Sequence, residues 1–576
     1  MNRRRAKRLL LLPIITLIVL QAAEATPSST QAIEYWLTQH FVHSTLSKEQ
    51  QQAELKWFHQ AAAPYRDLTI HVVSEDIPTH RYESQVLARA FYDLTGIHVI
   101  HEVTKEDDVV RKLQVQMELA LPIYDAYVND TDFIGTHSRY PETLAISAMM
   151  QNEWQHISLP TLDLDDFIGL QFATGIDGQL YQLPTQQFAN LYWYRHDWFS
   201  DPQLQQRFQA HYGYPLGVPQ NWAAYQDIAN FFTNIVKTID GQRVWGHMDY
   251  GHFDPSLGWR ISDSWLSLAG ANDILPDNGQ PYAEQQGVGD WGIRVEHCHP
   301  VGASVSRGGA LDSPAAIYAV ESYISWLNQY APPEARDLTF STSSAYLGRG
   351  NIAQQIFWYT AFLPDLLTDQ LLDSDGNPKW RVAPSPRGKY WQKGMKSGYQ
   401  DVSGWTFLRS TPKHRAAAAW LYAQFVVSKT VSMTKFLNGF TPIRQSDIHS
   451  RYLTANSDKW GGLLEFYQSK ARHYWTPTGL SVANYAALSD AWWRHIGPAV
   501  QGKQTVTDSM KQLANTVEQR LLAISKTDDL RCAPTLREAK PESYWLSQPG
   551  APWPQQQAPD KPATLPYQQA LQLWQD

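Results

Sequence analysis

The chain has 576 residues, of which 43% are hydrophobic and 18% are charged, and its formal net charge is −8. Such a chain is long enough for two folded cores, and bulk disorder is excluded because disordered chains carry few aromatic residues and much charge. Nucleic acid is not expected as a partner, because the net charge is negative and the sequence shows no basic patch. The 23 tryptophans fit either large cores or a surface that stacks on flat ligands such as sugars.

The first residues have the pattern of a secretory signal peptide. Five basic side chains within residues 3–8 precede an apolar run at residues 9–20, and Ala23-Glu24-Ala25 supplies a small-residue cleavage site. The run is too short to span a bilayer as a helix, which takes about 20 residues. We therefore expect residues 1–25 to be removed and the chain to be exported to the periplasm. No lipid anchor is expected there, because the residue directly after the cleavage site is not a cysteine.

The next part of the chain predicts alternating strands and helices. Residues 26–65 predict a helical extension, in which Ser47 begins a helix with a capping box. After it, periodicity predicts strands at residues 67–73, 97–103 and 123–128, and helices at residues 84–94 and 107–119. This β-α-β-α-β order predicts a parallel, doubly wound α/β sheet.

Carboxylates follow two of these strands directly. Glu75 and Asp76 come after the first strand, and Asp130 and Asp132 come after the third. Ligands of such sheets bind beyond the carboxyl ends of the strands, where these side chains can accept hydrogen bonds from hydroxyl groups. The alternative is that they only cap the helices that follow.

The rest of the chain shows further helices and strands and two cysteines. We expect strands at residues 188–194, 351–357 and 381–384, and helices at residues 222–237, 317–330 and 413–428. The Pro-rich end, residues 531–576, predicts an extended surface arm. Cys298 and Cys532 are either free or joined in one disulfide. His297 and His299 beside Cys298 also suggest a metal site, but a second ligand cluster is missing and no metal is expected.

Seven short segments, spread along most of the chain, form a recognisable set. They are Ser74–Pro78, Thr95–Ile97, Tyr124–Asp130, Gly309–Pro314, Gly350–Tyr359, Gly398–Asp401 and Tyr474–Gly479. Together with the β-α-β-α-β start, they resemble the extracellular solute-binding proteins of family 1, the periplasmic binding components of ABC importers for sugars and polyols. Within that family they look most like the binding proteins of glycerol import in Gram-negative bacteria.

The resemblance implies an α/β protein with the two-lobed periplasmic binding protein fold, whose discontinuous lobes are joined by a hinge near residues 383–384. It implies a monomer that needs no cofactor, binds a small polyol or sugar, with glycerol favoured, and delivers it to ABC permease subunits in the inner membrane. The expected parts are a signal peptide at 1–25, a helical extension at 26–65, lobe 1 at 66–180 and 385–445, lobe 2 at 181–384 and 446–530, and the arm at 531–576.

The resemblance and the chemistry of polyols together suggest the site residues. Carboxylates and amides take the hydroxyl groups of a polyol, and an aromatic ring stacks on its carbon face. The expected ligand-binding residues are Glu75, Asp76, Tyr127, Asp130, Asp132, Gln187, Trp358, Tyr399, Asp401, Trp405 and Trp475. For each of these rings the alternative is a place in the core, because most of the 23 tryptophans must be structural. Trp358 and Trp475 are expected to fill space that a disaccharide occupies in other binding proteins.

Two other functions remain open from the sequence. Paired carboxylates also serve exported carbohydrate-active enzymes such as glycoside hydrolases, so an enzyme is the main alternative. A chemoreceptor-docking or adhesion module without an importer is the other. Neither alternative explains the set of seven segments, and we therefore expect no catalytic residue.

Overall fold

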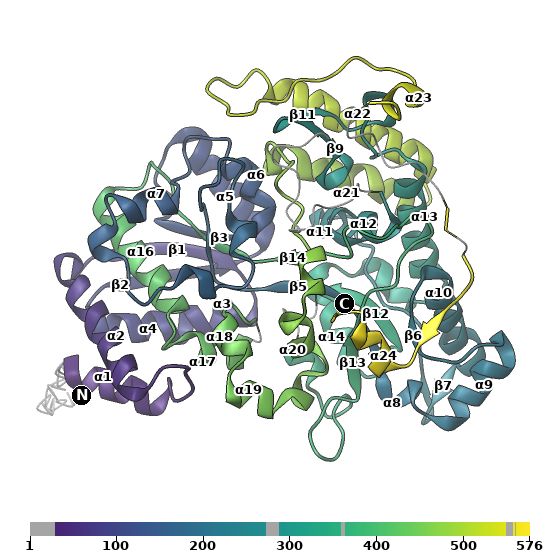
Figure 1. Ribbon diagram of the computed structural model, residues 1–576, viewed down its shortest axis with the longest axis horizontal. Coiled ribbons are helices and arrows are strands. Elements are labelled where there is room, and N and C mark those ends of the chain that lie inside the picture. Colours follow the sequence, from purple (N-terminus) through teal and green to yellow (C-terminus); the bar gives the residue numbers. More distant parts are fainter. Residues whose placement is uncertain are drawn as a thin grey trace, which may run out of the picture.

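A computed structural model describes residues 29–271, 287–358, 363–439, 441–548, 557–558 and 560–575. The expected signal peptide, residues 1–25, lies outside this part of the chain. The described residues form two lobes side by side, the first coloured mainly purple to blue and the second mainly teal to green (Figure 1). Within these residues no helix is both long and apolar enough to cross a membrane.

The first lobe is built on a five-stranded sheet with the order β2-β1-β3-β15-β4. Its strands are β1 (Thr69–Glu75), β2 (His98–Thr104), β3 (Ala126–Asn129), β4 (Leu183–Pro184) and β15 (Gly404–Thr406). β1 pairs in parallel with both β2 and β3, which confirms the predicted parallel start. β15 returns from far along the chain and pairs antiparallel with β3 and β4. The carboxyl ends of β1, β2 and β3 therefore meet at one edge.

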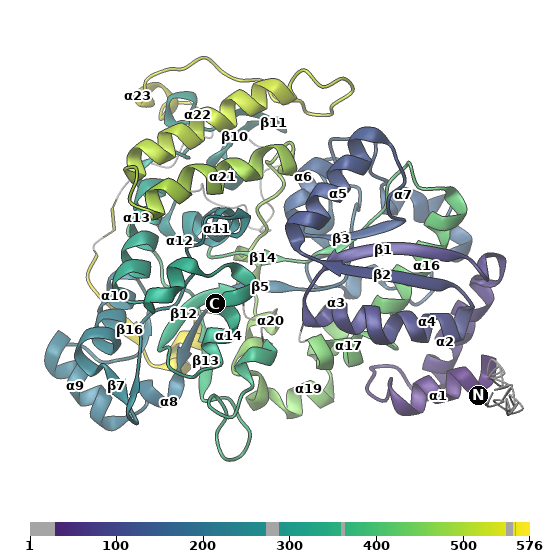
Figure 2. The same cartoon turned by 180° about the vertical axis from the view of Figure 1, so that it is seen from behind.

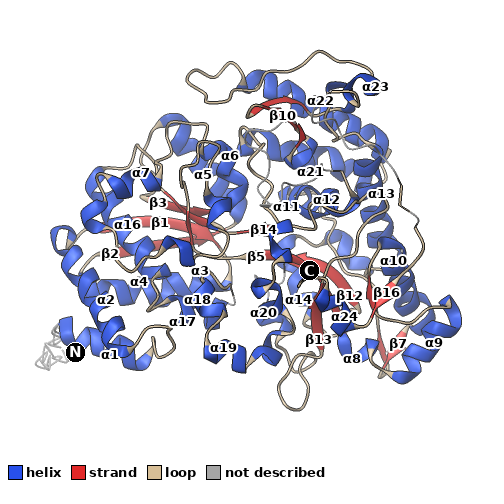
Figure 3. Ribbon diagram, viewed as in Figure 1, coloured by secondary structure: helices blue, strands red, loops and turns tan. Residues whose placement is uncertain are grey.

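Helices pack on both sides of this sheet (Figure 3). They include α1 (Ser29–Gln39), α2 (Lys48–Ala61), α4 (Ala88–Thr95), α5 (Glu106–Leu119) and α16 (Lys413–Val427). The predicted capping box at Ser47 is present at the start of α2. Gly96 ends α4 in the left-handed region with φ +77°, as the Thr-Gly sequence predicts. Phe58 of α2 and Phe91 of α4 both pack on Phe425 of α16, so the N-terminal extension shares the core of the first lobe.

The second lobe has a sheet of the order β12-β5-β13, with β14 also paired to β5. Its strands are β5 (Phe188–Arg195), β12 (Gln354–Trp358), β13 (Trp380–Ala383) and β14 (Gln400–Asp401). The helices α10 (Trp222–Asn230), α11 (Pro255–Arg260), α13 (Pro314–Gln329), α21 (Tyr485–Val500) and α22 (Val506–Ile524) belong to this lobe. All eight residues of β5 are buried, which explains why its sequence is almost continuously apolar.

Within the described residues, three segments carry the chain between the lobes. Residues 185–187 join β4 to β5, residues 402–403 join β14 to β15, and residues 441–444 lead from α17 (Ser432–Gly439) to α18 (Gln445–Ile448). Because β13 and β14 both pair with β5, residues 385–401 pack with the second lobe, although the sequence places them in the first. The chain therefore crosses at 402–403, not near the hinge expected at 383–384. The sequence does not predict this crossing because the short strand β14 shows no periodicity.

A buried ion pair holds the first crossing segment. Nζ of Lys435 on α17 lies 2.5 Å from Oε1 of Glu83, and both side chains are almost fully buried. Oγ1 of Thr185 donates a hydrogen bond of 3.0 Å to the same carboxylate, and Lys435 donates one to Thr185. Burial lowers the pKa of Lys435, while Glu83 opposes that shift. The start of the crossing segment is thus fixed to the first lobe.

The C-terminal arm is attached to the second lobe at several points. Cys298 and Cys532 form a disulfide with a Cα–Cα distance of 5.6 Å, which decides the question that the sequence leaves open. Further along the arm, β16 (Thr564–Leu565) pairs antiparallel with β6 (Val218–Pro219). The arm ends in α24 (Tyr567–Gln572), after which Trp574 is buried against Phe466. Figure 1 shows this yellow segment along the outer edge of the second lobe.

The lobes also touch where α6 (Ile134–His137) meets the loop before α21. A Cβ atom on Gly135 would lie only 2.2 Å from the carbonyl oxygen of Gly479, so glycine is required by this close approach. The buried guanidinium of Arg139 donates hydrogen bonds of 2.9 Å to Leu480 O and 3.0 Å to Cys298 O, both in the second lobe. Side chains add to these backbone and guanidinium contacts, since Oγ1 of Thr136 accepts a hydrogen bond of 2.9 Å from the amide of Tyr485.

Candidate ligand site

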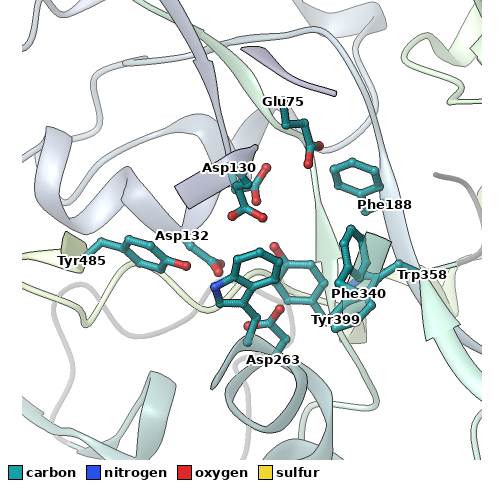
Figure 4. Close-up of a pocket in the computed structure, with 11 residues that line it drawn as sticks. Glu75, Asp130, Asp132, Phe188, Asp263, Phe340, Trp358, Tyr399 and Tyr485 are labelled. Atoms are coloured by element: carbon teal, nitrogen blue, oxygen red, sulfur yellow. The ribbon is translucent and has the colours of Figure 1, made fainter. Parts of the chain in front are cut away.

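A cavity lies between the lobes at the carboxyl ends of the first-lobe strands (Figure 4). Its empty space is about 380 Å³, and about 30 Å³ of this admits the centre of a water-sized molecule. One buried water needs about 10–15 Å³ by that measure, so the cavity holds about two or three waters. Its lining residues are Glu75, Glu106, Asp130, Asp132, Phe188, Trp259, Asp263, Phe340, Trp358, Tyr399 and Tyr485.

Five carboxyl groups line this space, and the sheet topology explains four of them. Glu75 ends β1, Glu106 begins α5 just after β2, and Asp130 and Asp132 follow β3. Because these strands are parallel, their carboxyl ends bring the four side chains to one edge. Asp263 comes from the second lobe, in the helical turn Ile261–Trp265 after α11. In Figure 4 the carboxyl groups of Glu75, Asp130, Asp132 and Asp263 surround one space.

Aromatic rings supply the remaining walls. Trp358 on β12 and Tyr399 before β14 have ring centroids 6.4 Å apart, and Phe188 begins β5. The buried guanidinium of Arg260 lies 5.2 Å from the ring of Trp358 and forms an ion pair of 2.8 Å with Asp249. A ring fixed in this way presents a firm face to the C–H groups of a ligand.

Two hydroxyl groups show how protons are shared among the carboxyls. Oγ of Ser403 is within hydrogen-bond distance of Oδ1 of Asp130 and of Oδ2 of Asp401. Oγ1 of Thr478 is likewise within reach of Asp132 and Asp263. A hydroxyl group has a single proton to donate. Each hydroxyl group can therefore form hydrogen bonds to both of its carboxyls when one of the two carboxyls is protonated and donates its proton to the hydroxyl oxygen.

The pKa directions agree with this proton sharing. Burial, reinforced by the charge of Asp401, raises the pKa of Glu75 and that of Asp132 to about 7 each. Burial raises the pKa of Asp130 well above its ordinary value, and Asp401 adds to this rise. The same holds for Glu106, where Glu75 adds to the effect of burial. Like charges in a water-poor space cannot all be ionised together.

One cation lies close to this acidic group. Burial lowers the pKa of Lys396, and the charges of Asp290, Asp132 and Asp263 oppose that shift. Its Nζ donates a hydrogen bond of 2.9 Å to Pro477 O. The cavity therefore offers both ionised carboxylates, which accept hydrogen bonds, and protonated ones, which donate. That combination suits hydroxyl groups, which do both.

Five of the residues proposed from the sequence line the cavity: Glu75, Asp130, Asp132, Trp358 and Tyr399. Asp76 does not. It lines the open groove outside the cavity, where it forms an exposed ion pair with Arg81. Asp401 is fully buried behind the lining, where its Oδ1 accepts a hydrogen bond of 2.8 Å from the amide of Thr131. Asp401 thus acts on the cavity through its charge.

The structure does not bring four other proposed residues to the cavity. Tyr127 is buried in the first lobe, where its hydroxyl donates 2.8 Å to Gln116. Trp405 is fully buried, with its ring 5.6 Å from that of Tyr422.

Trp475 packs within the second lobe, and Gln187 lies on the segment that crosses between the lobes. The indole Nε1 of Trp475 donates 3.1 Å to Asn190 O, behind the segment that carries Tyr399. Gln187 Nε2 donates 2.6 Å to Ile168 O. The three rings take the alternative that the sequence leaves open, a place in the core, and Gln187 ties the crossing segment to the backbone at Ile168.

Sequence reasoning missed six of the lining residues. Glu106 could have been found, because it follows the second predicted strand just as Glu75 and Asp130 follow the first and third. Tyr485, Phe340, Trp259 and Asp263 come from helices of the second lobe. Their positions depend on how those helices face the first lobe, for which the sequence carries no pattern.

In the described part of the chain, one group has the spacing of a metal site. Cys298, His299 and Cys532 have ligand atoms within 4.8 Å of one another. Both sulfur atoms are joined in the disulfide, so neither is a thiolate able to bind a metal ion. The group therefore does not fit a metal centre in its oxidised form.

Comparison with known proteins rests on the fold. No family model matches the sequence, and no curated protein matches it. Among solved structures, the chain is similar to a ribitol-bound solute-binding protein of an ABC transporter from Agrobacterium radiobacter K84, with a TM-score of 0.58 and 18% identity over 79% of this chain and 99% of that one. The maltose-bound MalE3 of T. maritima gives a TM-score of 0.57 and 17% identity over 78% and 99% of the two chains.

A third similar structure is a D-mannitol-bound ABC transporter solute-binding protein from Agrobacterium vitis S4, with a TM-score of 0.55 and 14% identity over 79% of this chain and 98% of that one. The chain has the two-lobed fold of periplasmic sugar-binding proteins. This confirms the predicted fold class. The cavity described above lies between the two lobes of this fold.

Proposed function

We propose that the chain is the periplasmic binding component of an ABC importer for a small polyol, with glycerol favoured. The single observation that carries this proposal is the cavity between the lobes, which combines carboxyl groups with aromatic walls. A polyol has hydroxyl groups for the carboxyls and C–H groups for the rings. Solved structures with the same fold hold ribitol, D-mannitol and maltose.

The size of the cavity favours a three-carbon polyol. About 30 Å³ is open to the centre of a water-sized molecule, which corresponds to about two or three waters. Glycerol is the smallest of the polyols and sugars considered, so its short carbon chain and three hydroxyl groups need less room than a sugar ring. Trp358 lines this space as proposed, while Trp475 packs behind it.

Export and delivery complete the proposal. Residues 1–25 have the pattern of a signal peptide, which supports a periplasmic location. The protein would act as a monomer and pass its ligand to permease subunits in the inner membrane. Binding would shift the lobes toward the closed arrangement, because the ligand contacts both lobes only there.

Calorimetry on the full mature chain tests the proposal. Glycerol, ribitol, D-mannitol, glucose and maltose are titrated in turn, and we expect saturable heat with glycerol. Heat and a melting shift with none of these ligands would overturn the assignment of the ligand class. As a control for the site, Asp130→Asn should weaken binding, whereas Asp458→Asn on the exposed surface should leave it unchanged.

A carbohydrate-active enzyme is the alternative, and the same variant separates it. An enzyme would release a chromophore from a chromogenic glycoside, and Asp130→Asn would abolish that rate while ligand binding survived. A binding protein shows the opposite pattern, with no rate at all and a loss of affinity.

A further inference from the structure

Two further spaces adjoin the inner cavity. The first is an outer groove of about 1500 Å³ between α3 (Pro78–Tyr82) and the start of α5 on the first lobe, and α11 and α14 (Phe340–Leu347) on the second. The second is a side groove of about 760 Å³ between α5 and α21. Figure 2 shows the side of the molecule on which α5 and α11 face one another. The inner cavity, at about 380 Å³, is the smallest of the three.

Trp259 is the residue that lines all three of these spaces. Phe340 lines the inner cavity and the outer groove. The two rings are in edge contact, with centroids 5.8 Å apart and an angle of 74° between their planes. Phe340 is in turn 5.5 Å from Trp358 on the cavity wall. These rings form a partition along part of the boundary between the cavity and the groove, a boundary that Glu75 and Glu106 also line.

The partition is held firmly in place. Trp259 lies on α11, whose first turn is capped by Asp254. Oγ of Ser256 on the same helix accepts a hydrogen bond of 3.3 Å from the amide of Phe340, which ties α14 to α11. The next residue after Trp259 is Arg260, which forms the buried ion pair with Asp249. Both rings therefore have little freedom to move aside.

The outer groove is lined by groups that bind hydroxyls. They include Asp76, Glu106, Asp107, Thr339 and Ser341. A longer polyol or a sugar ring would find hydrogen-bond partners there if it extended out of the inner cavity. Trp259 and Phe340 stand at the boundary that such a molecule would have to cross.

We propose that Trp259 and Phe340 determine ligand size, by confining the bound molecule to the inner cavity and excluding hexitols and sugar rings. This inference rests on the proposed function. Under this proposal, discrimination between ligands of different size depends on the two rings at the boundary between the cavity and the groove. The hydrogen-bonding groups inside the cavity take no part in that discrimination. Removing either ring joins the cavity to the groove.

Calorimetry with glycerol, D-mannitol and glucose on the full chain tests this. Wild-type protein should bind glycerol and give no heat with the larger two. Trp259→Ala and Phe340→Ala should each weaken glycerol binding about tenfold or more, as the loss of a pocket wall does, and should gain measurable binding of mannitol or glucose. Tyr452→Ala removes an exposed ring outside the cleft, and its ligand preference should equal that of the wild type.

The outcomes separate the two proposals. If the wild type binds none of these ligands, the proposed function fails. If the wild type binds mannitol or glucose as tightly as glycerol, the partition proposal is overturned while the binding function stands. It is also overturned if folded Phe340→Ala and Trp259→Ala variants keep the wild-type ratio of glycerol to mannitol affinity. Circular dichroism and melting temperature confirm that each variant is folded.

Discussion

Asp132 of the first lobe and Asp263 of the second lobe share one hydroxyl group. Oγ1 of Thr478 lies 2.9 Å from Oδ1 of Asp132 and 3.2 Å from Oδ1 of Asp263. Since the hydroxyl donates one proton, the link is complete when one of the two carboxyls is protonated. Burial raises the pKa of Asp132 to about 7 and that of Asp263 well above its ordinary value, and the charge of Asp132 adds to the second rise. When Asp132 ionises near neutrality, Asp263 therefore holds the proton that completes the link.

The stability advantage of Asp132→Asn should grow as the pH rises. In the folded protein the pKa of Asp132 is about 7, and in the unfolded chain it is about 4. Between these values the unfolded chain binds fewer protons than the folded one, so this group destabilises the fold progressively as pH rises. The variant cannot ionise at this position. We expect its melting temperature relative to the wild type to increase from pH 5 to pH 8.

Differential scanning calorimetry without ligand measures this difference. The comparison with the wild type cancels the opposite contribution of buried histidines such as His101, whose pKa burial lowers to about 3. Asp458→Asn, at an exposed position, is the matched control and should show no trend. A pH-independent difference for Asp132→Asn would contradict the raised pKa.

Removing one partner of the ion pair between Lys435 and Glu83 should be strongly destabilising. Lys435→Met leaves a buried carboxylate without its cation, which costs about 3–5 kcal/mol. The double variant with Glu83→Gln removes the uncompensated charge and should recover most of the loss. Urea unfolding of the four proteins gives the coupling energy. Equal losses in the single and double variants would show that the pair contributes nothing specific.

Removing the disulfide should release the C-terminal arm. The bridge closes a loop with a sequence separation of 234 residues, and the chain-entropy relation gives about 5 kcal/mol for a loop of that length. We expect the Cys298→Ser/Cys532→Ser variant to melt at a lower temperature and to be cut by proteases after α22. A reducing agent should have the same effect on the wild type and none on the variant. Unchanged melting under reduction would contradict a stabilising bridge.

Gly135→Ala should weaken ligand binding without touching the ligand. The added Cβ would lie 2.2 Å from Gly479 O and 2.4 Å from Val482 O, so α6 and the loop before α21 must separate. Asp132 lies just before α6 and Tyr485 just after that loop, and both line the cavity. We expect both glycerol affinity and melting temperature to fall. Gly178→Ala adds a methyl group to open space and should change only stability, through its left-handed backbone.

The sequence predicted the first lobe well because its signals are local. Alternation and helical spacing identify β1, β2 and β3 with the helices between them, and their order implies the parallel sheet. Glu75, Asp130 and Asp132 were found by the same logic, since their place beyond the strand ends follows from topology alone.

The rest of the site depends on packing between distant segments. Tyr127 and Trp405 have the residue type of a stacking ring, but they lie on β3 and β15 with their side chains in the first-lobe interior. Trp259 and Phe340 are set by the approach of α11 and α14, which are held together by the contact between Ser256 and Phe340. No spacing in the sequence distinguishes a tryptophan of the core from one at a cleft.

The two ends of the described chain belong to different lobes. α1 begins at Ser29 in the first lobe, whereas α24 packs against β13 and ends at Gln572 in the second, as the labels of α1 and α24 in Figure 1 show. Energy transfer between a donor dye and an acceptor dye attached at these ends would report the distance between the two lobes. The chain therefore already has the connectivity of a fluorescent sensor, with both attachment points outside the binding site.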